Sequence, residues 1–239
     1  MAAFLYTYLF FMKTTMIDQS RLQILAPEND LDLTDLAPLL VPAYKQVFGD
    51  ETWCEGWKCR RCNKKYALRD PGVVNGDCCG QQLEEFYSDT DVLKMFQELL
   101  LRRYQLRVVM EGRERVVGFQ WGWQDTLKGM NSKLDLWPEI LEQLGATLKT
   151  KGLYGDAMYY WSESGVLPDF RRLGLAKLMY QDIRQVLMRD VRTKLLRTTP
   201  RSPQYQFSRQ QGDVVVLNYS ENTRDRRVMD DRVLLAGVL

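Results

Sequence analysis

The stretch Val166–Leu178, VLPDFRRLGLAKL, decides how the rest of the sequence is interpreted. A run rich in tyrosine and tryptophan, typical of a buried strand, ends at Val166. Pro168 follows and cannot continue a ladder of hydrogen bonds, because it has no N–H group. From Gly174 onward apolar residues recur every three or four positions, which predicts a helix with one buried face. The stretch is therefore a strand–turn–helix connection that carries two arginines and a glycine.

This connection has the chemistry of an anion-binding site. The first N–H groups of a helix lack acceptors within the helix, and the helix dipole places partial positive charge there. A phosphate at such a position gains several hydrogen bonds at once. Small residues at Gly174 and Ala176 would let a pyrophosphate approach the backbone, and Arg171 or Arg172 would add positive charge. An ordinary connection with solvated arginines is the alternative.

The composition limits both the chemistry and the location. The 239 residues are 45% hydrophobic, enough for a globular core, and a net charge of +2 favours neither nucleic acid nor an anionic membrane. The chain has no histidine, so any general acid or base is a carboxylate, Tyr, Lys, Cys or water. All five cysteines lie within residues 54–79, which favours a reducing cytoplasm over a secreted, disulfide-bonded domain. The apolar leader 1–16 is too short to span a membrane; a mis-assigned start, a buried edge strand or an interfacial anchor would explain it.

Hydrophobic periodicity predicts an α+β domain over residues 17–239. The expected helices are Leu33–Phe48, Asp89–Tyr104, Leu136–Leu148, one that begins at Gly174, and a short piece between Pro203 and Gly212. The expected strands are Arg21–Leu25, Leu106–Met110, Arg115–Trp123, Ala157–Val166, Lys194–Thr198, Val214–Tyr219 and Val228–Val238. A loop is expected between Trp123 and Leu136. This order predicts a mixed α/β sheet of six or seven strands with flanking helices.

The spacing V-x-P-x-x-R-x-x-G-x-A over residues 166–176 resembles the acetyl-CoA signature, Arg/Gln-x-x-Gly-x-Gly/Ala, of the GNAT superfamily of acyl-CoA-dependent N-acyltransferases. The resemblance extends more loosely over about residues 20–239, apart from the cysteine block. It implies acetyl-CoA as cosubstrate, with the pantetheine arm in a gap between two splayed parallel strands, here Ala157–Val166 and Lys194–Thr198. The cofactor-binding residues that it implies are Val166, Leu167, Pro168, Arg171, Arg172, Leu173, Gly174, Leu175, Ala176 and Lys177.

Acetylation of an amine needs a group that takes its proton, because a lysine-like amine has a reference pKa of about 10.4. Glu163 is the candidate base. It lies three residues before Val166, and the resemblance places it at an acidic position common in the family. Its aromatic neighbours would raise its pKa by desolvation, and it would act directly or through a water. The alternative is that Glu163 is only a charged residue at a strand edge. A backbone N–H near Val166 or Leu167 would donate a hydrogen bond to the oxyanion of the tetrahedral intermediate.

The general acid is less well defined. Family members commonly place a tyrosine four residues before a glycine in the last helix, and here the position ahead of Gly212 is Ser208. Ser208, Tyr205 and water are therefore the candidates for protonating the leaving thiolate. The leaving thiol has a reference pKa of about 8.5, so protonation of its thiolate does not require a strong general acid. An asparagine expected upstream is replaced by Arg201, so the acetyl-CoA contact there is expected to differ.

Residues 54–80 interrupt the α/β pattern and resemble a zinc ribbon. A CxxC knuckle at Cys59 is followed, after a gap of fifteen residues, by two adjacent cysteines. The expected ligands are Cys59, Cys62, Cys78 and Cys79, with Cys54 as the alternative fourth ligand. A site closed by four thiolates has no open position, so we expect a structural zinc ion. Free cysteines, or a ribbon that no longer holds metal, are the alternatives.

Together these patterns predict an acetyl-CoA-dependent N-acetyltransferase that moves an acetyl group to a primary amine by direct attack on the thioester. A binding or regulatory module that holds acyl-CoA with little or no turnover, and recruits a partner through the ribbon, is the alternative; a larger acyl group is a third. Protein N-termini, lysines, polyamines and aminoglycoside-like antibiotics all fit as acceptors. We expect a cytoplasmic monomer or homodimer without nucleic acid or membrane partners.

Overall fold

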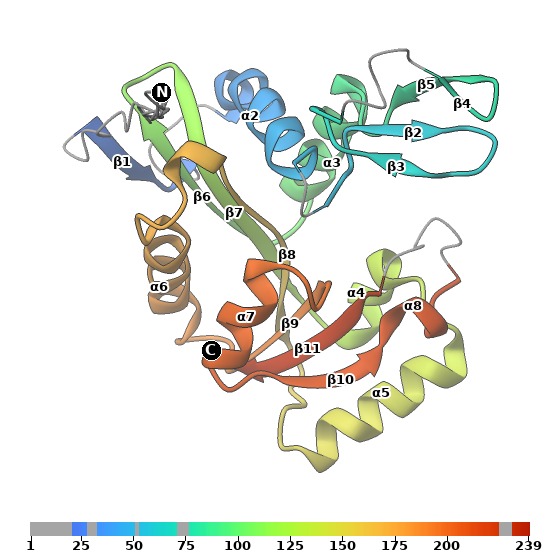
Figure 1. Ribbon diagram of the computed structural model, residues 1–239. Helices are drawn as coiled ribbons and strands as arrows, with labels where there is room; N and C mark the ends of the chain where they lie inside the picture. The colour runs from blue at the N-terminus through green and yellow to red at the C-terminus, as the bar shows by residue number, and fades with distance from the viewer. Residues whose placement is uncertain (1–20, 28–32, 51–52, 71–76, 225–230) are drawn as a thin grey trace, which may run out of the picture.

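A seven-stranded mixed sheet organises the computed structural model, which describes residues 21–27, 33–50, 53–70, 77–224 and 231–239 (Figure 1). The strand order is β1-β6-β7-β8-β9-β11-β10, and all pairs are antiparallel except β8 with β9. The strands are β1 (Leu22–Leu25), β6 (Tyr104–Glu111), β7 (Arg115–Asp125), β8 (Met158–Val166), β9 (Thr193–Thr198), β10 (Val214–Asn218) and β11 (Val233–Val238). The predicted α+β class and its mixed sheet are confirmed.

Helices pack on both faces of this sheet. They are α2 (Leu33–Phe48), α3 (Asp89–Leu100), α4 (Leu127–Leu134), α5 (Pro138–Thr150), α6 (Leu175–Leu187), α7 (Pro203–Gln210) and α8 (Tyr219–Asn222), with a 3-10 turn η3 at Pro168–Phe170. The glycines of the central strands show which helix lies on which face. A Cβ atom at Gly165 would meet Val47 of α2, whereas one at Gly118 would lie near Met179 of α6. The sheet is therefore sandwiched between α2 and α6 (Figure 1).

The sequence prediction was wrong at two helices: one was predicted too long, and another was not predicted at all. The helix α3 ends at Leu100 rather than Tyr104, because Tyr104 already begins strand β6. The predicted loop after Trp123 contains the helix α4. This helix is capped by Thr126, whose hydroxyl accepts a hydrogen bond of 3.0 Å from the Gly129 N–H. Its apolar face is narrow and its sequence polar, so the cap and tertiary packing, rather than helix propensity, account for it.

The cysteine-containing segment forms a second, four-stranded sheet with the order β3-β2-β5-β4. Its strands are β2 (Trp57–Cys59), β3 (Lys65–Tyr66), β4 (Asp77–Cys78) and β5 (Gln81–Glu85), so the small sheet continues beyond residue 80. We call residues 53–87 the ribbon insertion.

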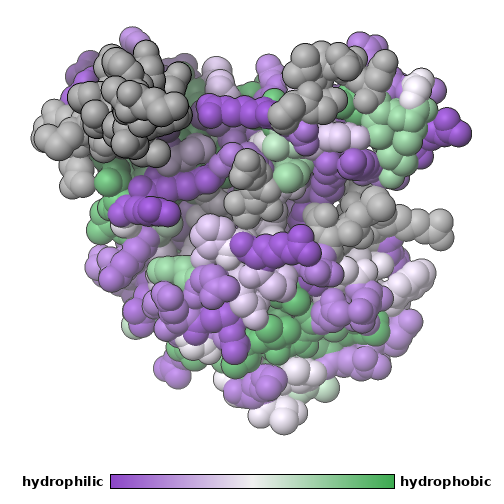
Figure 2. Space-filling view, in the orientation of Figure 1, coloured by the Kyte–Doolittle hydropathy of each residue, from purple (hydrophilic) through white to green (hydrophobic). Residues whose placement is uncertain are grey.

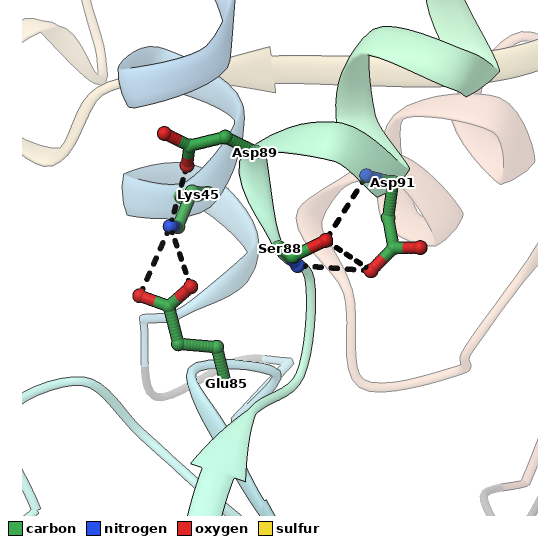
Figure 3. A network of polar contacts seen from close by, with 5 residues as sticks. All are labelled: Lys45, Glu85, Ser88, Asp89 and Asp91. Atoms are coloured by element: carbon green, nitrogen blue, oxygen red, sulfur yellow. Dashed lines mark hydrogen bonds and ion pairs between the residues drawn. The ribbon is translucent and has the colours of Figure 1, made fainter.

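Polar contacts join the ribbon insertion to the helices beside it (Figure 3). The Lys45 ammonium of α2 lies 3.0 Å from the Glu85 carboxylate and 2.8 Å from that of Asp89. Ser88 and Asp91 form a capping box that starts α3 directly after the small sheet. Both ends of the insertion are thus adjacent to helices of the main fold.

In the described part of the chain, no helix combines the length and the apolar character that a bilayer crossing requires. The leader 1–16 lies outside the described residues, and so do residues 228–230 of the predicted last strand. The part of that strand within them, β11, begins at Val233.

Candidate active site

The parallel strands β8 and β9 separate near the middle of the sheet. They pair through only three residue pairs, of which the last is Trp161 with Leu196. Beyond this pair β8 continues to Val166 and β9 to Thr198, and no further pairing joins these described residues. Unpaired edges leave backbone N–H and C=O groups available to a ligand. The two strands therefore part at the place that the GNAT resemblance implied.

A bulge in β8 decides the direction of Glu163. Trp121 of β7 pairs with Glu163, but the next residue of β7 pairs with Trp161, so Ser162 is the extra residue. Side chains alternate between faces in a regular strand, and without the bulge Glu163 would share the face of Trp161. Trp161 stacks on Tyr180 of α6. The extra residue places Glu163 on the opposite face, where it lines a cavity beside α3.

The backbone of Val166 faces the gap between the two strands. The Leu167 N–H donates a hydrogen bond of 2.9 Å to the Val117 carbonyl, and Val166 pairs with Gly118. In an antiparallel ladder this pattern makes Val166 and Gly118 a non-hydrogen-bonded pair, so the Val166 N–H points away from β7. The Leu167 carbonyl accepts from the Phe170 N–H at 2.9 Å. Of the two residues expected to offer backbone groups, Val166 has its N–H directed toward the gap.

The turn after β8 opens the N-terminus of α6 to solvent. Arg172 and the N-cap residue Gly174 have φ angles of 66° and 78°, a left-handed conformation that Gly174 adopts without strain. Gly174 provides no side-chain cap for the first N–H groups of α6. A Cβ atom placed on Gly174 would meet nothing within 4 Å, so the space in front of the helix is open.

Positive charge surrounds this opening. Arg171, Arg172 and Lys177 are exposed, and the surface over this turn and the start of α6 is hydrophilic (Figure 2). Arg171 is held in place, because its guanidinium lies 2.7 Å from the Asp50 carboxylate and 3.2 Å from the Val166 carbonyl. The turn therefore presents a fixed backbone and a cationic rim, as expected for a site that binds a pyrophosphate.

Glu163 lies beside a small cavity of about 30 Å³, enough room for one water molecule. The cavity is lined by Met95, Glu98, Leu99, Arg102, Trp121, Trp123, Lys133, Ser162 and Glu163. The Glu163 side chain is partly exposed there, but the surrounding protein raises its pKa by burial. The positive charges of Lys133 and Arg197 oppose this rise. A carboxylate with a raised pKa next to room for water has the properties of a general base.

Several residues near Glu163 were not identified from the sequence. Glu55 lies at the start of the ribbon insertion, yet it is only 4% exposed. It accepts a hydrogen bond of 3.1 Å from the Tyr87 hydroxyl, and its carboxylate lies 2.7 Å from the Arg232 guanidinium. The one available signal was that Glu55 lies between two tryptophans, directly before a basic run that begins at Lys58. No such signal marks Arg232 in the sequence.

The two protein candidates for the general acid differ in accessibility. Ser208 is completely buried on α7, and its backbone carbonyl accepts from the Asp213 N–H at 3.1 Å. Tyr205 is only partly buried on the same helix. A group that protonates a leaving thiolate has to reach solvent or substrate. This geometry favours Tyr205 over Ser208.

Four cysteines of the ribbon insertion converge. Among the described residues the Sγ atoms of Cys59, Cys62, Cys78 and Cys79 all lie within 4.8 Å of one another, and Cys54 is not part of this group. Two of the Sγ–Sγ distances are 3.6 Å. Zinc–sulfur bonds of about 2.3 Å in a tetrahedron place the sulfur atoms about 3.8 Å apart. The four thiols thus have the spacing that a tetrahedral metal ion needs.

Local backbone geometry brings these thiols together. In the CxxC knuckle the Asn63 N–H donates to the Cys59 carbonyl at 2.8 Å, and Asn63 has a φ of 57°. Cys79 also has a positive φ, 55°, and its Sγ lies 3.6 Å from that of Cys78. A hydrogen bond with the Lys64 backbone, helped by neighbouring thiols, lowers the pKa of Cys62 to about 7, whereas hydrogen bonds with Cys62 and Cys78 raise the pKa of Cys79 to about 12. A thiolate is the form that binds metal.

Comparison with known proteins identifies the fold. No protein-family model and no curated protein matches the sequence. The structure matches a polyamine N-acetyltransferase of Drosophila melanogaster at 11% identity and a TM-score of 0.54, covering 91% of this chain and 100% of that chain. It matches arylalkylamine N-acetyltransferase 2 of Aedes aegypti at 11% identity and a TM-score of 0.52, covering 91% and 98%. This chain therefore has the GNAT-like acetyltransferase fold that the sequence resemblance implied.

Proposed function

We propose that this chain is an acetyl-CoA-dependent N-acetyltransferase that acetylates a primary amine. The observation that carries the proposal is that three features occur together along strand β8 and the turn that follows it. The strand β8 separates from β9, ends in a turn with an open, glycine-capped helix N-terminus, and carries Glu163 beside a cavity. The enzymes of similar fold named above are N-acetyltransferases of amines.

The proposed reaction uses groups of the chain itself. The pyrophosphate of acetyl-CoA binds at the start of α6, and the pantetheine arm lies along the unpaired edge of β8. The amine nitrogen attacks the thioester carbon, a C–N bond forms, and the C–S bond breaks. Glu163 takes the amine proton, directly or through a water in its cavity. The Val166 N–H stabilises the oxyanion, and Tyr205 or water protonates the thiolate.

A broad panel of amines tests this proposal through release of free CoA thiol. The panel contains peptides with free N-termini, lysine peptides, polyamines and aminoglycosides, each with acetyl-CoA and with longer acyl-CoA. We expect turnover with at least one amine. Tight CoA binding without turnover across the whole panel would instead support the binding-module alternative.

We further propose that the ribbon insertion holds one structural zinc ion. The soft thiolates of Cys59, Cys62, Cys78 and Cys79 suit zinc, and four protein ligands leave no open coordination position. When bound, the ion would supply cross-linking of the small sheet rather than chemistry. The buried area of such a small sheet is too limited for it to fold without help.

Replacement of Glu163 by glutamine tests its role as the base. At neutral pH we expect kcat/KM to fall by roughly 10² to 10⁴, the range that general base catalysis contributes. The loss becomes smaller at high pH, where more of the amine is already deprotonated. Because burial raises the pKa of Glu163, the acidic limb of the wild-type pH profile lies above the ordinary range of a glutamate. The full pH dependence of kcat/KM measures both effects, and a loss independent of pH would indicate positioning of the substrate instead.

A further inference from the structure

We propose that Glu55 is a positioning residue through which the ribbon insertion sets the electrostatic environment of Glu163. The inference rests on the proposed function for its effect on catalysis, but its first test does not need turnover. It assigns the insertion an indirect part in the candidate active site, through the candidate base.

Glu55 joins three separate segments of the chain at a buried point. Its side chain is 3% exposed. Its carboxylate lies 3.1 Å from the Lys65 ammonium in β3 of the insertion and 2.7 Å from the Arg232 guanidinium just before β11. It also accepts from the Tyr87 hydroxyl at 3.1 Å. A buried carboxylate with three partners of this kind is fixed in position, because loss of any partner would leave a buried charge poorly paired.

An aromatic chain leads from Glu55 to Glu163. The Tyr87 ring, whose hydroxyl binds Glu55, meets the edge of the Tyr44 ring with centroids 5.3 Å apart. Tyr44 stacks on Trp121 at 5.8 Å, and Trp121 is the strand partner of Glu163. Ring contacts and one strand pair therefore connect the insertion to the strand position of the candidate base.

The charges of Glu55 and Arg232 also act on Glu163 in opposite directions. The negative charge of Glu55 raises the pKa of Glu163, and the positive charge of Arg232 lowers it. The charged groups that face Glu163 are Lys133 of α4, Arg197 of β9, Glu55, Arg232, and the cavity residues Glu98 and Arg102. The phenols of Tyr44, Tyr87 and Tyr160 also face it. Glu55 offsets the positive charge of its partner Arg232 within this largely cationic set.

The variant Glu55→Gln keeps the size of the side chain and removes its charge. We expect the carboxyl titration of Glu163, followed by ¹³C NMR in the full-length protein, to shift to lower pH. The acidic limb of the kcat/KM profile should shift in the same direction, and the plateau rate should fall by less than about tenfold, because a weaker base is a poorer proton acceptor.

Glu85→Gln is the matched control. It is the same substitution in the same insertion, and Glu85 also pairs with a lysine, Lys45 (Figure 3). Unlike that of Glu55, however, its side chain is 45% exposed. We expect no shift of either titration. Arg232→Gln is a second variant, for which we expect a shift in the opposite direction. Removal of its positive charge should move the Glu163 titration and the acidic limb of the kcat/KM profile to higher pH.

The outcomes separate this inference from the proposed function. An unchanged Glu163 titration in both Glu55→Gln and Arg232→Gln would overturn the inference, even if the enzyme is active. Shifted titrations in a protein that never turns over would support the inference while the proposed function fails. Equal shifts in Glu55→Gln and Glu85→Gln would also overturn it, because the effect would then be a general one of net charge.

Discussion

Replacement of Gly174 by glutamate is expected to weaken acetyl-CoA binding by more than about 100-fold. The reason is the geometry at the start of α6. Gly174 faces open space in front of the helix N-terminus, and a carboxylate there would occupy the position of the pyrophosphate and repel it. Isothermal titration calorimetry with CoA and acetyl-CoA measures the loss.

Backbone strain has to be separated from charge in this experiment. Gly174 has a φ of 78°, so any side chain costs about 1 kcal/mol or more of stability. Gly112, in the hairpin between β6 and β7, has a φ of 65° and equally open surroundings. Gly112→Glu should therefore lose similar stability and keep its CoA affinity. Unchanged affinity in a folded Gly174→Glu protein would remove the pyrophosphate site from this turn.

Much of the fold could be predicted because local patterns and tertiary packing agree. The helix Leu33–Phe48 was predicted at its observed bounds, and α6 begins one residue after Gly174, as its apolar spacing indicates. The helix α4 was missed because its sequence is largely polar, and burial of its few apolar side chains in the main core stabilises it. Prediction was therefore good where each segment's own sequence favours its structure.

The candidate site was only partly predictable for a different reason. The turn of residues 166–177 is contiguous, so its spacing could be read directly. The direction of Glu163 depends on a bulge at Ser162, and nothing in the sequence marks that extra residue. Glu55 and Arg232 lie 177 positions apart and meet only in the folded chain. Long-range electrostatic partners of this kind have no local signature.

Replacement of Cys59 by serine is expected to abolish stoichiometric zinc binding and to unfold the small sheet, while the large sheet stays folded. Cys59 is the one buried thiol of the group, and a serine hydroxyl is a poor replacement for a thiolate ligand. Structural zinc sites contribute roughly 10 kcal/mol or more to folding of small domains, far more than the small sheet can supply by burial. Chelation of zinc from the wild-type protein should have the same effect.

Cys54→Ser is the matched control for this prediction, because Cys54 is a cysteine of the same segment outside the four-thiol group. We expect elemental analysis to find one zinc per chain in the wild type and in Cys54→Ser, and none in Cys59→Ser. Limited proteolysis should then cut within residues 57–85 of Cys59→Ser and of the chelated wild type, and spare the seven-stranded sheet. Metal-free protein that resists cleavage across this segment would show that the thiols converge without a structural ion. Loss of zinc from Cys54→Ser would instead place Cys54 in the coordination sphere, in competition with one of the two adjacent cysteines.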